Sequence, residues 1–553
     1  MQIFKIEFAF KIVKIYGDKM KNSSKILLGF MLVMMICCVS AVSATDINST
    51  DDAIITDEIV VDDVSEIVED VGIDDASDDV VDEEINDVSD DVVGENLRGP
   101  DTGKVNNVAY TNYFNPTTGV LTNTAATTLT FTGNFNQKAF PNFIINRAVT
   151  INANGATFND VGFNLIGDSI TLNRGTFYST QNVAGTATIN VEGNNVKIDD
   201  VNINVNVPAD ADFFAIDVTG ANGTQILNSE IVYNCPYVNG DNTNYVIRAK
   251  NSPDIVIFGN VIYAGLPLKT VDYWSGTRFG MDMDLVAGIG LENCNRFNIT
   301  LNDLNIIISN YSDSFPTLDS IIVLDSENGT IAHNWIDEID DVTPIGGASY
   351  LYTIDVYRCD NLLIDDNDLN LTSYGGTVIP GTINGTGAAY GIQLTGGYTN
   401  VTLSNNDIHT RNNGPNCGIY SQNFAGATDL KIIDNTIYVE GNALTSHSWS
   451  LVTGIELQDN AAYIAGNTIT VYNKATFNPG DNVYGISFSQ YGTVSPKMEI
   501  TNNNVNVING EFAIYIQYSQ DSEAYENCLN TSYHHGDDAV YDNGDIDIHD
   551  NYW

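Results

Sequence analysis

Aromatic and amide side chains recur at one place in a repeated segment of this chain, and these residue types suit a sugar ligand. Tyr357 and Tyr420 fall on the opening strands of the repeat, and Trp274 and Trp449 fall in the variable connections beside them. Aromatic rings stack on sugar rings, and amides and phenols hydrogen-bond to sugar hydroxyls. We therefore expect these four residues to bind a glycan in a groove between the opening strands and the connections. The alternative is an ordinary polar sheet surface.

Charged residues gather on the same side. Asp217, Arg248, Lys250 and Glu292 fall on three successive copies of the repeat, where opposite charges on neighbouring strands would form a cross-strand ion-pair patch. Hydrolysis of a glycosidic bond needs two carboxylates about 5–9.5 Å apart. Asp355 and Glu456 are three copies apart, or about 14 Å at the spacing of strands, so they do not meet that need.

The cysteines and histidines do not indicate a metal site or a catalytic site. The five cysteines beyond residue 44 form no Cys-x-x-Cys pair, and the six histidines form no evident cluster. Cys294 and Cys359 each lie five residues after a repeated isoleucine, at a position that other copies fill with small residues. We expect these two thiols to be small buried fillers of a turn.

A repeat of about 30 residues places all of these side chains, and Tyr390–Arg411 (YGIQLTGGYTNVTLSNNDIHTR) shows it best, with three short apolar strands and a turn after each. Alternation along each strand puts Ile392 and Leu394, and then Val401 and Leu403, on one face. The opening strand carries an isoleucine in nearly every copy: Ile189, Ile216, Ile247, Ile289, Ile321, Ile354, Ile392, Ile419, Ile455, Ile486 and Ile514.

A second anchor is an asparagine in the phrase apolar-x-x-Asn-x-apolar, at the tight turn between the second and third strands. Its copies are Asn260, Asn302, Asn334, Asn367, Asn406, Asn435, Asn467, Asn503, Asn527 and Asn551. Asparagine tolerates left-handed backbone geometry, and its amide both donates and accepts hydrogen bonds. Stacked once per repeat, these side chains predict a structural ladder.

Three short strands cannot bury their own apolar face, whereas stacked copies can. The β-branched residues and the period of two exclude a helical-repeat solenoid. The sequence therefore predicts an all-β parallel β-helix of about 14 coils with three strands in each.

The chain divides into four parts by composition. Residues 1–44 form a leader, with the secretory signal proper at 20–44. Residues 45–100 hold 21 Asp and Glu against one basic residue, Arg98, which predicts a disordered acidic spacer. Residues 101–148 are expected to cap the first coil, and residues 149–553 to form the coils. We expect the coils to continue past Trp553, because Asn551 and Trp553 still follow the repeat.

The charge balance limits the partners. The 553 residues include 22 Lys and Arg against 71 Asp and Glu, a net charge of −49. This excludes nucleic acid and anionic membranes as natural partners. The acidic spacer could bind Ca²⁺, but it lacks the fixed ligand spacing of a calcium loop, so we expect no cofactor.

The Gly391-Ile392 phrase of the opening strand, the asparagine column and the closing Asn551-Tyr552-Trp553 resemble the pectate-lyase-like right-handed parallel β-helix superfamily over residues 149–553. The leader, acidic spacer and asparagine-rich coils together resemble adhesin-like surface proteins of methanogenic archaea. The first resemblance implies a right-handed helix and a possible polysaccharide lyase. Such an enzyme needs a base and cations that neutralise a uronate, for which Asp217, Arg248, Lys250 and Glu292 are the candidates.

The second resemblance implies an adhesin-like protein, secreted or held at the cell surface. It would bind a surface glycan or a partner on a host or microbial surface, without inserting the mature chain into a membrane. We expect no enzyme activity. A polysaccharide lyase and a structural component of the cell wall are the alternatives. Sequons such as those at Asn222 and Asn400 make surface glycosylation a further expectation.

Overall fold

The computed structural model describes residues 101–180, 186–206, 213–235, 244–270, 286–311, 316–341, 350–373, 388–442, 451–475, 482–489, 497–534, 536–543 and 546–552. All of them belong to one compact unit, Gly94–Trp553. The predicted leader and acidic spacer lie outside the described residues, as do Trp274 and Trp449 and any Ca²⁺ site in the spacer.

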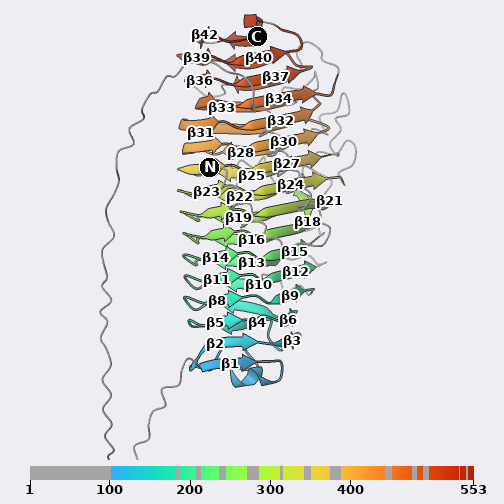
Figure 1. The fold of residues 1–553 in the computed structure, drawn as a ribbon, viewed down its shortest axis with the longest axis vertical. Coiled ribbons are helices and arrows are strands. Elements are labelled where there is room, and N and C mark those ends of the chain that lie inside the picture. Colours follow the sequence, from blue (N-terminus) through green and yellow to red (C-terminus); the bar gives the residue numbers. More distant parts are fainter. Residues whose placement is uncertain are drawn as a thin grey trace, which may run out of the picture. The chain divides into compact units, whose positions relative to one another are not determined.

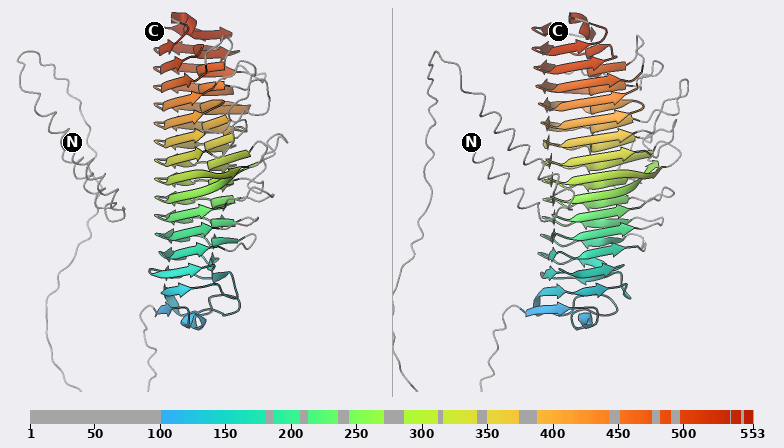
Figure 2. Two further views of the ribbon diagram at one scale, coloured as in Figure 1. Left: turned by 90° about the vertical axis from the view of Figure 1, so that its right-hand side faces the viewer. Right: turned by 45° about the vertical axis from the view of Figure 1, so that its right-hand side comes forward.

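The described residues form 42 strands that stack as three sheets (Figures 1 and 2). The first sheet contains β4 (Asn142–Ile145), β7 (Gly162–Leu165), β10 (Thr186–Val191), β13 (Phe213–Thr219), β16 (Asn244–Lys250), β19 (Val286–Glu292), β22 (Pro316–Leu324), β25 (Tyr350–Tyr357), β28 (Ala388–Thr395), β31 (Asn416–Ile433), β33 (Leu451–Ala465), β35 (Asn482–Ser489), β38 (Phe512–Gln517) and β41 (Val540–Asn543). The second sheet contains β1 (Asp101–Val105), β2 (Ala126–Phe131), β5 (Thr150–Asn152), β8 (Thr171–Asn173), β11 (Lys197–Asp199), β14 (Gln225–Leu227), β17 (Val256–Phe258), β20 (Asn298–Thr300), β23 (Thr330–Ala332), β26 (Leu362–Asp365), β29 (Thr399–Ser404), the later parts of β31 and β33, β36 (Met498–Thr501), β39 (Ser522–Tyr525) and β42 (Ile546–His549). The third sheet contains β3 (Gly133–Phe135), β6 (Ala156–Asn159), β9 (Thr176–Ser179), β12 (Asn202–Asn206), β15 (Glu230–Asn234), β18 (Val261–Thr270), β21 (Asp303–Tyr311), β24 (Trp335–Asp340), β27 (Asp368–Ser373), β30 (Asp407–Asn412), β32 (Thr436–Gly441), β34 (Thr468–Asn473), β37 (Asn504–Ile508) and β40 (Cys528–Thr531).

Each strand pairs in parallel with its equivalents in the coils before and after it. β25, for example, lies between β22 and β28. A short antiparallel contact joins the end of β18 to the start of β22. The fold is a right-handed parallel β-helix, which confirms the predicted class.

The interior of the helix is apolar, and the same residue type stacks on itself in successive coils. Ile354 pairs with Ile321 on one side and Ile392 on the other, and all three are fully buried. The same register joins each repeated isoleucine to the next, from Ile189 to Ile514. The predicted isoleucine ladder is therefore present, and burying these side chains stabilises each coil only because the next coil covers it.

The ten asparagines also form one continuous column at the turn between the second and third sheets. Asn406 Nδ2 donates to Asn435 Oδ1 at 2.9 Å and to the carbonyl of Ile364 at 3.0 Å. Asn406 Oδ1 accepts from the backbone and side-chain nitrogens of Asn367 at 3.1 and 2.9 Å. The same pattern continues to Asn260 in one direction and to Asn551 in the other.

One detail of this turn differs from the expectation. The left-handed backbone belongs to the residue before each ladder asparagine, such as His333 (φ 56°), Asp366 (φ 51°) and Asn405 (φ 55°). The ladder asparagines themselves do not have positive φ angles. They are held by their amide hydrogen bonds, and the preceding residue makes the bend.

The segment 101–148 contains β1 to β4 and the 3₁₀ helix η1 (Ala109–Asn112). β2, β3 and β4 pair in parallel with β5, β6 and β7, so these strands lie on the three sheets of the coils. Phe114, Phe131 and Phe143 fill the interior here, with ring centroids 4.8–6.0 Å apart. Aromatic packing thus occupies the end of the helix where the isoleucine ladder has not yet begun.

The first strands interrupt their alternation just before the ladder isoleucine. Tyr390 and Ile392 both pair with their equivalents in β25, while Gly391 lies between them. A Cβ on Gly391 would collide with Ile408 of the third sheet, so position 391 faces the interior. Tyr390 contacts the ring of Tyr420 on the outer face, with centroids 5.4 Å apart. The residue two before the isoleucine therefore points outward.

Candidate functional site: the outer face of the first sheet

The outer face of the first sheet is built from columns of side chains fixed by the strand register. One column runs through Asp217, Arg248, Gly290, Ile322, Asp355, Gln393, Tyr420, Glu456, Ser487 and Tyr515. A second column lies two residues further along each strand and includes Lys250, Glu292, Tyr357, Gln422 and Gln458. The residue type changes from coil to coil, in contrast to the ladders.

The four charged residues lie on three successive coils, as their spacing indicated, and they form ion pairs across neighbouring strands. Arg248 donates from Nε and Nη2 to the two carboxylate oxygens of Asp217, both at 2.8 Å. Its guanidinium also lies 4.0 Å from the ring centroid of Phe214. Lys250 Nζ is 3.5 Å from Glu292 Oε2. Because each cation has a carboxylate partner, this geometry supports a structural patch better than a uronate site.

A hydrogen-bonded network of amides lies further along the same face. The hydroxyl of Tyr420 and Nε2 of Gln422 both donate to Gln458 Oε1, at 3.1 and 2.9 Å. Gln458 Nε2 in turn donates to Glu456 Oε1 at 2.8 Å. Burial raises the pKa of Glu456 to about 7. A carboxyl group poised near neutral pH therefore lies at the end of a chain of polar groups that begins at Tyr420.

Tyr357 and Tyr420 are both half-buried and lie two coils apart, or about 10 Å at the spacing of strands. The Tyr357 ring packs over Gly396 and lies 4.7 Å from the guanidinium of Arg358. It also borders an apolar cluster on the outer face: Ala187, Phe214, Tyr245, Ala287, Ile322 and Leu324. The two tyrosines are thus on one face but not in contact.

Several polar members of these two columns are buried, although they lie on the outer face of the sheet. Asp355 is fully buried, and Gln393, Glu456, Gln458 and Glu292 are only 5–7% exposed. Asp355 Oδ1 accepts from Gln393 Nε2 at 3.2 Å. Tyr357, Tyr390, Tyr420 and Gln422 are partly exposed, so a ligand could reach them. Asp217, Arg248 and Lys250 are also partly exposed.

Sequence reasoning missed an aromatic column on this face. It lies two residues before six of the eleven ladder isoleucines and contains Phe214, Tyr245, Tyr352, Tyr390, Tyr484 and Phe512. Tyr352 stacks on Tyr390 at 5.2 Å, and Tyr390 meets Tyr420. The recurrence of an aromatic residue at this place was visible in the sequence. Strict alternation assigns it to the interior, and the interruption of the strand moves it outside.

The buried thiols are poor nucleophiles. Burial raises the pKa of Cys294 to about 11 and that of Cys359 to about 12. Both are fully buried, and the backbone nitrogen of Cys294 donates to Ser326 Oγ of the next coil. Their expected role as fillers of an inward turn is confirmed, and thiolate chemistry is disfavoured at neutral pH.

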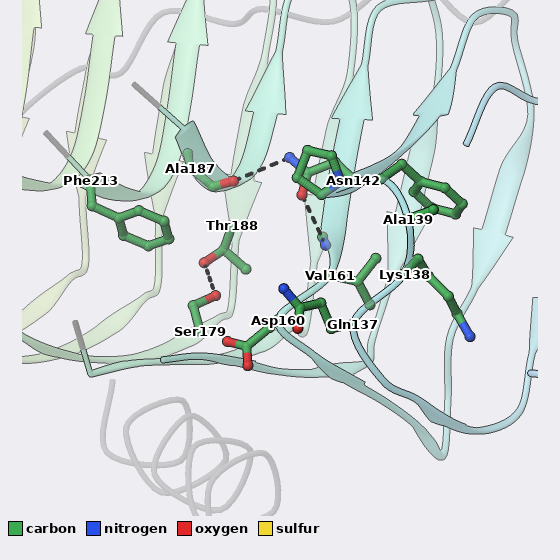
Figure 3. A pocket seen from close by; sticks show the side chains of 13 residues that line it. Gln137, Lys138, Ala139, Asn142, Asp160, Val161, Ser179, Ala187, Thr188 and Phe213 are labelled. Carbon is green, nitrogen blue, oxygen red and sulfur yellow. Dashed lines mark hydrogen bonds between the residues drawn. The ribbon is translucent and has the colours of Figure 1, made fainter. Parts of the chain in front are cut away.

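A pocket of about 230 Å³ lies near the start of the helix, where β4, β7 and β10 begin (Figure 3). Its polar side chains bond to the chain itself. Ser179 and Thr188 share a hydrogen bond of 2.7 Å, and Asn142 Oδ1 accepts from the backbone of Gly162 at 3.0 Å. Asp160 Oδ1 accepts from the backbone of Thr180 at 2.7 Å. The pocket is smaller than most ligand sites and has few groups left to bind one.

Two further properties concern only the described residues. No three of their His, Cys, Asp and Glu side chains come together as a metal site would need. None of their helices is long and apolar enough to cross a membrane.

No protein-family model and no curated protein matches this sequence. Among solved structures, the chain is similar to the periplasmic alginate epimerase AlgG (11% identity, TM-score 0.40, covering 78% of this chain and 85% of that one). It is also similar to PfbA, a surface adhesin of Streptococcus pneumoniae (12%, 0.35, 66% and 86%), and to the catalytic domain of a GH87 alpha-1,3-glucanase (13%, 0.36, 83% and 71%). These are parallel β-helix proteins. At such identities and scores, no residue's role carries over.

Proposed function

We propose that this chain is a secreted or cell-surface, adhesin-like protein that binds a glycan along the outer face of the first sheet. The observation that carries the proposal is the set of partly exposed aromatic and amide side chains there. Tyr357, Tyr390, Tyr420 and Gln422 lie on neighbouring coils of one rigid sheet. Rings held on one face can each make a weak contact with a polysaccharide, and several contacts act together.

The location outside the cell is part of this proposal and depends on the predicted leader, residues 1–44. The resemblance to surface proteins of methanogenic archaea is compatible with it but rests on composition. Trp274 and Trp449 stay as predicted stacking residues in the connections beside this face. Ca²⁺ binding by the acidic spacer also stays a prediction, and the glycan binding proposed here does not depend on it.

A glycan array with the purified protein tests the proposal. We expect wild-type protein to bind one class of polysaccharide and the Tyr357→Ala, Tyr420→Ala double variant to lose at least about tenfold in affinity. Tyr463→Ala is a matched control, because Tyr463 is 36% exposed on the outer face of the second sheet. Equal binding by the double variant and the control would contradict the assignment to the first sheet.

The polysaccharide lyase alternative makes a different prediction. It assigns catalysis to Asp217, Arg248, Lys250 and Glu292, so the protein would release unsaturated uronate, which absorbs ultraviolet light. Product formation that disappears in Arg248→Ala would establish the lyase and reject a purely adhesive role. If neither glycan binding nor product is found, a structural component of the cell wall becomes the better description.

A further inference from the structure

The outer face of the third sheet carries an unusual group of exposed apolar side chains on three adjacent strands. Tyr263 on β18, Ile307 on β21, and Trp335 and Ile339 on β24 are 41–53% exposed. Ile307 and Ile339 are direct partners in the register. We call this group, with the carboxylates described next, the Trp335 patch. Figure 1 shows β18, β21, β24 and β27 following one another along one side of the stack.

Three carboxylates surround the exposed tryptophan. Asp303 and Asp368 are the register partners of Trp335 on the two neighbouring strands, and Asp337 lies two residues along β24 on the same face. Neighbouring strands are about 4.8 Å apart and alternate residues about 7 Å, so all three lie close to the ring. The sheet thus presents one large exposed aromatic side chain with carboxylates on three sides of it.

Within the described part of the chain, none of these three carboxylates forms an ion pair with a lysine or arginine. Asp303 accepts from Asn305 Nδ2 at 2.7 Å and Asp368 from Asn370 Nδ2 at 2.9 Å, so their partners are neutral amides. The basic residues on β30 pair with other acids: His409 with Asp407 at 3.1 Å and Arg411 with Glu440 at 3.6 Å.

The like charges in the patch act on one another. Burial and then repulsion by Asp337 raise the pKa of Asp303, while burial and repulsion by Asp407 and Asp337 raise the pKa of Asp368. A cation placed between these groups would relieve that repulsion and would also interact with the Trp335 ring.

We propose that the Trp335 patch binds a basic polypeptide segment, with a lysine or arginine side chain over Trp335 and apolar side chains on Ile307 and Ile339. Aromatic residues and apolar patches with a polar rim are typical of protein interfaces. The two isoleucines favour a polypeptide over a sugar. The net charge of −49 disfavours a second copy of this chain, whose own patch would be repelled. This surface is distinct from the face proposed to bind glycan.

Fluorescence anisotropy with the full chain tests the proposal, using a labelled (Lys-Leu)₄ peptide as the probe and (Glu-Leu)₄ as the charge-reversed probe. We expect Trp335→Ala and Asp337→Asn each to weaken (Lys-Leu)₄ binding by about tenfold. Asp337→Asn preserves the size of the side chain, so it keeps the test valid if Trp335→Ala folds poorly. The difference should persist at 0.15 M salt, where interactions beyond about 8 Å are screened.

Two control variants distinguish the patch from general attraction to an acidic chain. Tyr178→Ala removes a 43% exposed ring from the same sheet, and Asp434→Asn removes an exposed carboxylate elsewhere. Both should bind within about twofold of wild type. Equal binding by all four variants would overturn the proposal. So would chitosan oligomers whose binding depends on Trp335 and Asp337 while that of the peptide does not, since the site would then recognise a cationic sugar.

Discussion

The asparagine ladder and the outer face of the first sheet belong to the same helix but differ in how far their residue types repeat from coil to coil. In the ladder, the same residue occupies every coil from Asn260 to Asn551 and bonds to its copy in the next coil. On the outer face, one column holds an aspartate, an arginine, an isoleucine, a glutamine and a tyrosine in nearby coils. The repeated asparagines satisfy the hydrogen bonds of the buried backbone. The varied side chains of the outer face give each group of coils a different chemical surface on the same backbone.

Asn406→Ala should show the largest effect, because it removes a ladder member from the middle. Four buried groups lose a partner: the Ile364 carbonyl, Asn435 Oδ1, and the backbone and side-chain nitrogens of Asn367. Asn435 Oδ1 keeps the bond from the Asn406 backbone nitrogen, and Asn367 Nδ2 keeps its bond to the Ile331 carbonyl. The cost therefore falls mainly on the other two groups, at about 1–3 kcal/mol each, so we expect a loss of about 4 kcal/mol. Denaturant midpoints measure it.

Two asparagines calibrate that result. Asn551→Ala should cost less, because Asn551 is half-buried and water can replace some of its bonds. Asn504→Ala changes an exposed asparagine next to the ladder and should stay within about 0.5 kcal/mol. Equal midpoints for Asn406→Ala and Asn504→Ala would remove the distinction between ladder and surface.

Glu456→Gln tests whether the buried carboxylate of Glu456 on the outer face destabilises the folded protein. The folded-state pKa of about 7 lies above the ordinary value of 4.5, so the folded state binds more protons between these pH values. Wild-type stability should therefore fall as pH rises from about 4.5 to 7, by up to about 3 kcal/mol. Glu456→Gln should lack that fall and be the more stable protein at pH 8, as thermal unfolding across pH can measure.

Tyr390 and Cys417 lie close to Glu456 and stay neutral in this range because burial raises their pKa values. A wild-type profile parallel to that of the variant would contradict the assignment.

Gly454→Ala tests the interruption of the first strands and should cost about 2 kcal/mol by overpacking. A Cβ there would collide with Ile469 Cγ2 and approach the carbonyl of Gly485. Ser487→Ala, on the outer face of the next coil, should change the unfolding free energy by less than about 1 kcal/mol. A neutral Gly454→Ala would mean that position 454 faces outward.

The same positions show which features of the structure could be predicted from the sequence and which could not. The isoleucine and asparagine columns were predictable because their period and residue type repeat, and stacking follows from both. The aromatic column with Tyr352 and Tyr390 was not, because its position depends on an irregularity before Ile354 and Ile392 that strict alternation does not predict. A glycine marks this irregularity before Ile392, but Thr353 stands at the same place before Ile354. The burial of Asp355 and Glu456 was not predictable either, since alternation gives the face of a side chain but not what covers it.

The coil-to-coil hydrogen bonds have a mechanical consequence. Successive ladder asparagines are 24 to 42 residues apart, and their coils are joined by bonds directed along the stack. Pulling an end coil away would break one coil's bonds at a time and release about 80–150 Å of extended chain for about 4.8 Å of stack lost. Under tension, such a protein would lengthen in steps and dissipate work at each step. The coils that are still folded would keep their surfaces intact.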